Sequence, residues 1–163
     1  MDIQKIETNS QQIDDIVRSI IGDKTAELDN YMTMVRNCFL NTNQVSDDDL
    51  HLISLRLGVY MYGLIDALEQ LNIRKGVSKE QAAYSENDVL LTATGTVQEK
   101  KAKAENQTAE DRMTQLAYAS ASNILMKKID GANTILGTVK SVLASRKQEK
   151  VLTNMAGNSV GAF

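Results

Sequence analysis

The segment SDDDLHLISLRLGVYMYGLIDALEQL, residues 46–71, decides the fold class of this 163-residue chain. Its apolar side chains repeat every seven residues in two registers, at Leu50, Ile53, Leu57, Tyr60, Leu64, Ala67 and Leu71. Such heptads form the seam by which one helix packs against another. Ser46 and Asp49 together make a capping box, a common start of a helix. The segment therefore predicts one long helix with a packing seam.

The composition of the whole chain extends this prediction. Proline is absent, although average usage would supply about eight prolines in a chain of this length. Since an interior proline breaks a helix, its absence favours helix almost throughout. Tryptophan is also absent and aromatic residues make up only 4% of the chain, so aliphatic side chains must fill the core. We expect an all-α fold of long helices with coiled-coil-like seams, arranged as a helical hairpin or bundle.

Residues 1–45 are expected to form an N-terminal helical segment with two shorter helices. The first runs from about Ser10 to Ile21 and ends at Gly22, because glycine often follows the last helical turn. The second begins after Asp23, and its apolar stripe consists of Leu28, Tyr31, Val35 and Phe39. Residues 41–43, with the sequence Asn-Thr-Asn, predict a turn.

Beyond the heptads, the sequence predicts a helix end, a new start and then a break. The end is expected at Gly76, which follows two basic residues that complement the negative end of a helix. Ser78 with Gln81 predicts the capped start of another helix. The stretch Thr92–Thr96 contains three threonines and a glycine, which are poor helix formers, so we expect a break there. Residues Gln98–Gln107 favour helix but have almost no apolar face, which predicts an exposed helix.

The longest helix is expected to start at a capping box of Thr108 and Asp111 and to run to about Leu152. It carries a second seam, formed by Tyr118, Leu125, Ile129, Ala132, Ile135, Leu136, Val139, Val142 and Leu143. Residues 154–163 are rich in glycine and asparagine and predict a flexible tail. The helical core for binding and oligomerisation is then residues 46–153.

The two seams predict self-association. Together they offer more apolar surface than a few short helices can cover within one chain, so we expect a homo-oligomer. The residues expected at its interface are Leu57, Leu64, Leu125, Ile129, Leu136, Val139 and Leu143.

The chain lacks the residues of the common catalytic and metal sites. It has one histidine, His51, and one cysteine, Cys38, which we interpret as a small core residue beside Phe39. His51 and Asp47 are one turn apart, but two ligands do not make a metal site. We therefore expect no enzyme activity, no catalytic residue, no metal and no cofactor.

The N-terminus has no basic stretch followed by an apolar one, and no 18 uncharged apolar residues run together. We expect a cytoplasmic protein that is not secreted by a recognisable signal and does not enter a membrane.

The charge of −3 is unevenly distributed. Residues 1–76 hold 7 basic and 12 acidic side chains, whereas residues 77–163 hold 11 basic and 9 acidic ones. The basic residues cluster first at Lys100, Lys101 and Lys103 and then along the last predicted helix, at Lys127, Lys128, Lys140, Arg146, Lys147 and Lys150. A polyanion would therefore bind the second half of the chain.

From about Leu50 to Val151 the chain resembles the UvsY-type recombination mediators of tailed phages. The resemblance is carried by a capped apolar helix, by the step Lys101-Ala102-Lys103, and by the stretch Leu136–Arg146, LGTVKSVLASR. It implies a helical oligomer that binds single-stranded DNA and helps to load a RecA-like recombinase in place of single-strand-binding protein. It also implies that Lys101 and Lys103 contact the DNA.

Two function classes remain open at this stage. The first is a non-enzymatic DNA-binding mediator, whose contacts would include Lys100, Lys101, Lys103, Lys127 and Lys128. The second is a structural coiled-coil protein of a phage particle or scaffold, in which the lysines are only solvated. The uneven charge favours the first class, and the net acidity favours the second.

Overall fold

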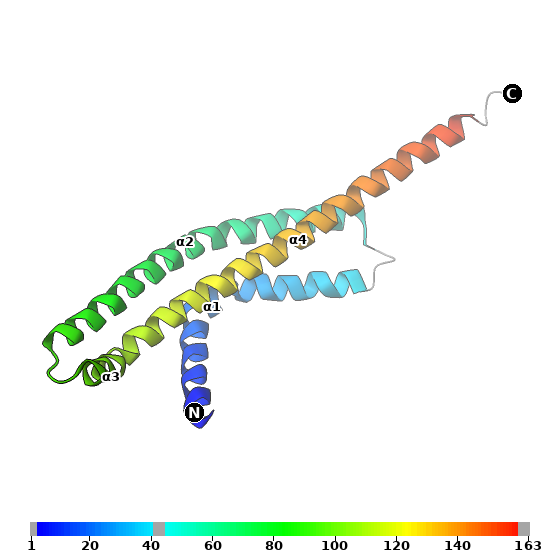
Figure 1. The fold of residues 1–163 in the computed structure, drawn as a ribbon. Helices are drawn as coiled ribbons and strands as arrows, with labels where there is room; N and C mark the ends of the chain where they lie inside the picture. The colour runs from blue at the N-terminus through cyan, green and yellow to red at the C-terminus, as the bar shows by residue number, and fades with distance from the viewer. Residues whose placement is uncertain (1–2, 41–44, 160–163) are drawn as a thin grey trace. The chain divides into compact units, whose positions relative to one another are not determined.

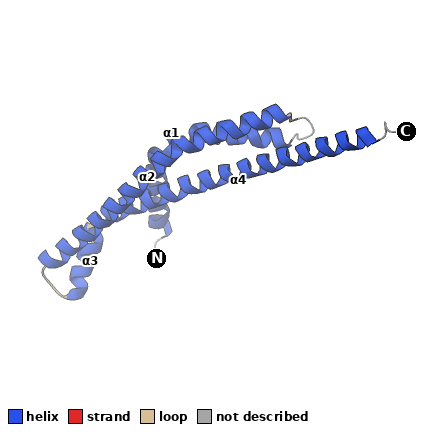
Figure 2. Cartoon of the chain, turned by 90° about the horizontal axis from the view of Figure 1, so that it is seen from above, coloured by secondary structure: helices blue, strands red, loops and turns tan. Residues whose placement is uncertain are grey.

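The computed structural model describes residues 3–40 and 45–159, and these confirm the all-α fold. Four helices follow one another: α1 (Ile3–Leu40), α2 (Asp47–Thr92), α3 (Val97–Gln107) and α4 (Ala109–Ser159). Figure 1 traces them along the chain, and Figure 2 shows helices joined by loops with no strand in the described residues. The predicted turn at residues 41–43 lies outside the described residues.

The helices contribute to two compact units, each built from separate stretches of the chain. The first unit consists of Met1–Ala26 and Leu64–Lys127, and the second of Glu27–Gly63 and Lys128–Phe163. Each unit therefore takes one part of α1, one part of α2 and one part of α4, whereas α3 belongs to the first unit alone. This division by packing differs from the segments 1–45, 46–153 and 154–163 expected from composition.

The core of the first unit consists of aliphatic side chains with many small residues. Its buried members are Val17, Ile21, Thr25, Leu64, Ala67, Leu71, Ser78, Ala82, Ala104, Thr108, Ala117, Ala121, Ser122 and Leu125. Two polar contacts join α2 to α4 at its edge. The Ser122 hydroxyl donates to the Asn72 side-chain oxygen at 2.7 Å, and Arg112 pairs with Glu86 at 3.0 Å.

The core of the second unit contains more of the large side chains. Its buried members are Leu28, Tyr31, Val35, Leu50, Ile53, Leu57, Met61, Ala132 and Val139. The rings of Tyr31 and Tyr60 pack with their centroids 5.4 Å apart, which joins α1 to α2. At the start of α2, the Ser46 hydroxyl accepts from the Asp49 amide at 3.1 Å and the Asp49 carboxylate accepts from the Ser46 amide at 3.3 Å. This confirms the predicted capping box.

The predicted helix end at Gly22 is wrong, because α1 runs through it without a break. Buried side chains follow one another at spacings of three or four residues, from Val17 and Ile21 to Thr25 and Leu28. Burial of this stripe outweighs the cost of one glycine in a helix, which is about 1 kcal/mol. Residues 10–39, expected as two helices, therefore belong to one.

The predicted end at Gly76 is also wrong. The buried stripe of α2 continues from Leu71 to Ser78 and Ala82, and the helix continues to Thr92. The Ser78 hydroxyl donates to the Lys75 carbonyl at 3.1 Å, as a serine inside a helix often does, so it does not start a new helix. The predicted break at Thr92–Thr96 and the exposed helix after it are confirmed.

The structure places the start of α4 where the sequence predicts it, but not its end. The Thr108 hydroxyl donates to the Ala104 carbonyl at 2.8 Å and so stabilises the end of α3 instead of forming the predicted capping box. At the other end, α4 extends to Ser159, so the expected tail is helical over residues 154–159. Residues 160–163 lie outside the described part of the chain.

The seams expected to need a partner chain are largely covered within this chain. Leu57, Leu64, Leu125 and Val139 are buried in the two cores. The other residues expected at an oligomer interface, Ile129, Leu136 and Leu143, are half-buried. The seams are covered because parts of the three long helices α1, α2 and α4 contribute to each unit. Leu57, Leu64, Leu125 and Val139 therefore offer no free surface to a second copy.

The interpretation of Cys38 as a core residue is wrong, because its side chain is exposed. The buried stripe of α1 passes through Val35, and Phe39 is half-buried. Adjacent residues on a helix point about 100° apart, so an apolar neighbour in sequence does not bury Cys38.

Candidate nucleic-acid interface

The lysines at residues 100–103 lie on α3, whose position depends on the turn before it. Gly95 has a φ of +121°, a backbone conformation that side chains disfavour. A Cβ at Gly95 would also lie 2.6 Å from a carboxylate oxygen of Glu99. Glycine is therefore required here for two reasons, its backbone angle and the close approach of Glu99.

A capping box fixes the first turn of α3. The Thr96 hydroxyl accepts from the Glu99 amide at 3.3 Å, and the Glu99 carboxylate accepts from the Thr96 amide at 2.7 Å. The backbone hydrogen bond from Thr96, followed by the bond from its hydroxyl, lowers the pKa of Glu99 below its usual range. The pattern Thr-x-x-Glu is visible in the sequence, but the sequence analysis did not identify this cap.

The three lysines of α3 project from a helix with little core. Ala104 is the one buried residue of α3, whereas Lys101 and Lys103 are exposed and Lys100 is half-buried. The Lys103 ammonium donates to the Thr94 carbonyl at 3.2 Å, which ties α3 to the preceding loop. Within residues 3–40 and 45–159, none of these lysines pairs with a carboxylate. Their charges are available to an anion from solution.

The other two lysines of the predicted DNA-binding set lie elsewhere. Lys127 is exposed, about 27 Å along α4 from Ala109 at 1.5 Å per residue. Lys128 belongs to the second unit and forms an ion pair with Asp29 of α1. Lys100, Lys101 and Lys103 therefore share α3, whereas Lys127 lies on α4 and Lys128 is paired within the second unit.

The basic residues near the end of α4 are partly neutralised within the second unit. Asp47 pairs with Arg146 at 2.9 Å and with Lys150 at 2.7 Å, and Arg146 also donates to the Val45 carbonyl at 2.7 Å. The hydrogen bond from Lys150, followed by that from Arg146, lowers the pKa of Asp47 below its usual range. Lys140 and Lys147 remain exposed. The sequence analysis did not predict these pairs.

In the described part of the chain, no group of three or more histidine, cysteine or acidic side chains is arranged to hold a metal ion. His51 is exposed and lies near Asp47, Lys147 and Lys150, beside two cationic groups that would oppose a metal cation. None of the described helices has an apolar stretch long enough to cross a membrane.

Comparisons with known proteins give no match: no protein-family model, no curated protein and no solved structure is significantly similar to this chain.

Proposed function

We propose that this chain is a non-enzymatic protein that binds single-stranded DNA through α3 and helps to load a RecA-like recombinase in place of single-strand-binding protein. One observation carries the DNA-binding part of this proposal. α3 is capped at both ends but contributes one buried residue, Ala104, and it holds three lysines without a carboxylate partner in the described chain. Packing alone does not explain a helix of this composition.

The chemistry of the exposed side chains suits a flexible polyanion. Lysine ammonium groups bind the phosphates that every nucleotide carries, so the contact does not depend on sequence. Each contact is favourable because it releases condensed counterions from the nucleic acid. Tyr84, on α2 of the same unit, is 76% exposed and lies about two turns before the end of that helix. Exposed aromatic rings stack on unpaired bases, which are accessible in single strands. The recombinase and single-strand-binding protein enter the proposal through the resemblance to UvsY-type mediators.

Self-association belongs to the same proposal. Ile129, Leu136 and Leu143 are half-buried along α4 and leave apolar surface for a second copy. A cyclic oligomer would repeat the α3 lysines, and affinity for phosphates grows with the number of lysines engaged. Measurement of the mass in solution should show an oligomer at micromolar concentration, and Leu136→Asp should dissociate it. A monomeric wild-type protein would contradict this part.

The salt dependence of binding to a single-stranded oligonucleotide tests DNA binding. Replacing Lys101 and Lys103 by alanine should weaken binding and flatten the slope of log affinity against log salt by about 0.7 per lost phosphate contact. The matched control replaces Lys140 and Lys147 by alanine, which removes the same charge from exposed positions on α4. Equal weakening in both variants would show that net charge alone is responsible, and would contradict a site on α3.

A structural coiled-coil protein of a phage particle or scaffold is the second candidate. It is favoured by the pairing of Lys128, Arg146 and Lys150 with Asp29 and Asp47, which offsets two of these three positive charges within the chain. It is also favoured by exposed apolar residues such as Leu55 and Leu91, which suit contacts with other proteins. This candidate predicts no measurable binding of single-stranded DNA at about 50 mM salt, where a lysine cluster should still be effective.

A further inference from the structure

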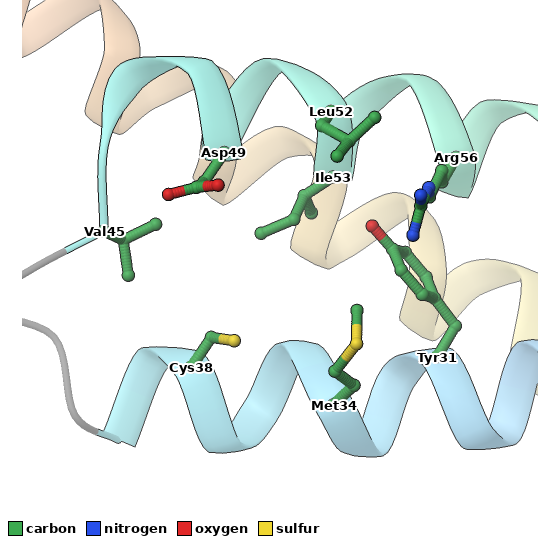
Figure 3. Close-up of a pocket in the computed structure, with 8 residues that line it drawn as sticks. All are labelled: Tyr31, Met34, Cys38, Val45, Asp49, Leu52, Ile53 and Arg56. Atoms are coloured by element: carbon green, nitrogen blue, oxygen red, sulfur yellow. The ribbon is translucent and has the colours of Figure 1, made fainter.

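A groove beside Cys38 lies between α1 and α2 of the second unit, as Figure 3 shows. Its volume is about 390 Å³, and its lining includes both Arg56 and Asp49, which carry opposite charges. The charge of the groove therefore favours neither an anion nor a cation as its occupant. The outer face of α2 in the first unit is more informative, because its apolar and charged residues follow a definite order along the helix.

The outer face of α2 between residues 73 and 91 is apolar and open to solvent. Ile73, Val77, Tyr84 and Leu91 are 67%, 61%, 76% and 83% exposed. They follow one another at spacings of four, seven and seven residues, which places them on one side of the helix. The buried Ala82 lies on the opposite side, so this face takes no part in the core of the unit. At 1.5 Å per residue the face is about 27 Å long, which is long enough to pack against another helix.

The spacing assigns the residues of this face to heptad positions. Position a holds Val77, Tyr84 and Leu91, and position d holds Ile73, Glu80 and Asn87. A parallel pair of identical helices would place each residue opposite its own copy, so the Glu80 carboxylates of two chains would repel each other inside the interface. An antiparallel pair places a positions opposite d positions and avoids this contact. The face therefore suits an antiparallel pair of identical helices.

One antiparallel register matches the residues of this face to one another. When the two-fold axis is level with Ala82, the facing pairs are Ile73 with Leu91, Val77 with Asn87, and Glu80 with Tyr84. The Tyr84 hydroxyl is a donor and the Glu80 carboxylate is an acceptor, so the charged group near the axis gains a partner. Each contact occurs twice, since the axis exchanges the two chains.

An ion pair at the edge of the face fits the same register. Arg74 and Asp88 occupy position e, both side chains are exposed, and neither forms an ion pair among the described residues. Antiparallel packing brings the e positions of two helices together, so Arg74 of each chain lies beside Asp88 of the other. At the other edge, Gly76 and Ala83 occupy position g, and their small size lets the two helices approach closely.

The remaining charged residues near this segment do not oppose the pairing. The side of the helix opposite this face holds Lys75, Lys79 and Glu86. Asp66 and Glu69 continue the face toward the start of α2, but the facing helix ends at Thr92 and does not reach them. The paired segment therefore ends where the acidic part of the face begins.

We propose that the outer face of α2 in the first unit pairs with the same face of a second copy, antiparallel and across a two-fold axis level with Ala82. This pairing goes beyond the proposed function and uses no residue of α4, through which the proposed oligomer associates. It covers Tyr84, so while the pair is formed DNA is held by the α3 lysines alone.

The mass in solution of Leu136→Asp, which blocks association through α4, measures the pairing by itself. This variant should have the mass of a dimer at micromolar concentration. Val77→Asp in the same background should give a monomer, because it places a charge in the interface. Leu116→Asp, at an exposed position on α4 of the same unit, is the matched control and should stay a dimer. Circular dichroism of each variant confirms that it is folded.

A charge exchange in the Leu136→Asp background tests the register. Arg74→Asp or Asp88→Arg alone should weaken the dimer about tenfold, because each places like charges side by side twice. The variant with both substitutions should regain the dimer, since it restores opposite charges. In a parallel pair these two positions lie far apart, so the double variant would show no recovery.

A cross-link tests the position of the axis. With Cys38, the one cysteine of the chain, replaced by serine, Ala83→Cys should form a disulfide-linked dimer with oxidised glutathione. The reason is that position 83 of one chain lies beside position 83 of the other. Lys79→Cys, on the opposite side of the same helix, is the control and should stay a monomer on a non-reducing gel.

Three results would overturn the proposal. A monomeric Leu136→Asp variant would show that α2 does not pair. No recovery in the double charge variant would exclude this register. Equal cross-linking at positions 79 and 83 would show that the chains meet without a defined face.

Discussion

α3 and the C-terminal part of α4 are both rich in lysine, but their charges have different environments. Lys100, Lys101 and Lys103 on α3 have no carboxylate partner in the described chain, whereas Arg146 and Lys150 on α4 both bind Asp47. Asp47 and Arg146 are 99 residues apart in sequence. The comparison shows that a basic run in a sequence is available to a ligand only when the fold brings no acid to it.

A charge placed in the core of the second unit should have the largest effect on stability and should free the paired end of α4. Val139 is fully buried in the core of the second unit, so Val139→Asp places a charge where no water reaches it. We expect the free energy of unfolding to fall by about 3 kcal/mol or more, and Arg146 and Lys150 to become as free as the lysines of α3.

Denaturant unfolding and the reactivity of Lys150 toward an acylating reagent measure the two effects. Ser141→Asp adds the same charge at an exposed position on the same helix and serves as the control. Unchanged stability of Val139→Asp would show that the described core of the second unit is incorrect.

Distortion of the turn before α3 should have a smaller effect on stability and should affect α3, the proposed DNA-binding helix, alone. Gly95→Ala forces a side chain into a backbone angle of +121° and against Glu99, at a cost of about 1–3 kcal/mol. Hydrogen exchange should show faster opening of α3, and DNA affinity should fall. Gly137→Ala, where a Cβ meets nothing within 4 Å, should instead stabilise α4 by up to about 1 kcal/mol.

Loss of the cap of α3 should have a similar or slightly smaller effect. Thr96→Ala removes the hydroxyl that accepts from the Glu99 amide, which typically costs about 1 kcal/mol. Thr92→Ala removes a hydroxyl that only donates to a carbonyl within α2, and it provides the matched control. If hydrogen exchange in α3 is the same in both variants, the cap does not hold the helix.

Acid should weaken the paired region of α4 by a modest amount. The folded-state pKa of Asp47 is lowered, so its contribution to stability is present above the ordinary value of 3.8 and is lost as pH falls through the folded pKa. The free energy of unfolding, measured with denaturant at each pH, should therefore fall as the pairs with Lys150 and Arg146 break. Asp47→Asn should remove this step from the pH profile. The same step in the variant would assign it to another carboxyl group.

The sequence predicts the parts of this structure that depend on local periodicity. The heptads at Leu50–Leu71, the cap at Ser46 and the break before Thr96 all arise from residues close together in the chain, and the structure confirms them. The helix ends expected at Gly22 and Gly76 are wrong because a local stop signal is weak compared with a buried stripe. That burial depends on which distant helix covers the stripe, and a single sequence does not show this.

The candidate site is predictable to a similar extent. The exposed lysines of α3 could be predicted from its lack of an apolar face, and its cap could have been identified from the Thr-x-x-Glu pattern. The pairing of Lys128 with Asp29 and of Arg146 with Asp47 depends on contacts between distant helices. The sequence alone therefore does not distinguish these paired basic residues from the unpaired lysines of α3. The groove beside Cys38 likewise exists only once α1 and α2 pack together.

A lysine footprint measures the central claim, that α3 presents free cations to single-stranded DNA. Each lysine is acetylated in the presence and absence of an oligonucleotide, and its rate is measured by mass spectrometry. We predict that DNA protects Lys100, Lys101 and Lys103, whereas the rates of the exposed Lys140 and Lys147 stay unchanged. Protection of Lys140 and Lys147 without protection of the α3 lysines, or no protection at any lysine, would contradict the account.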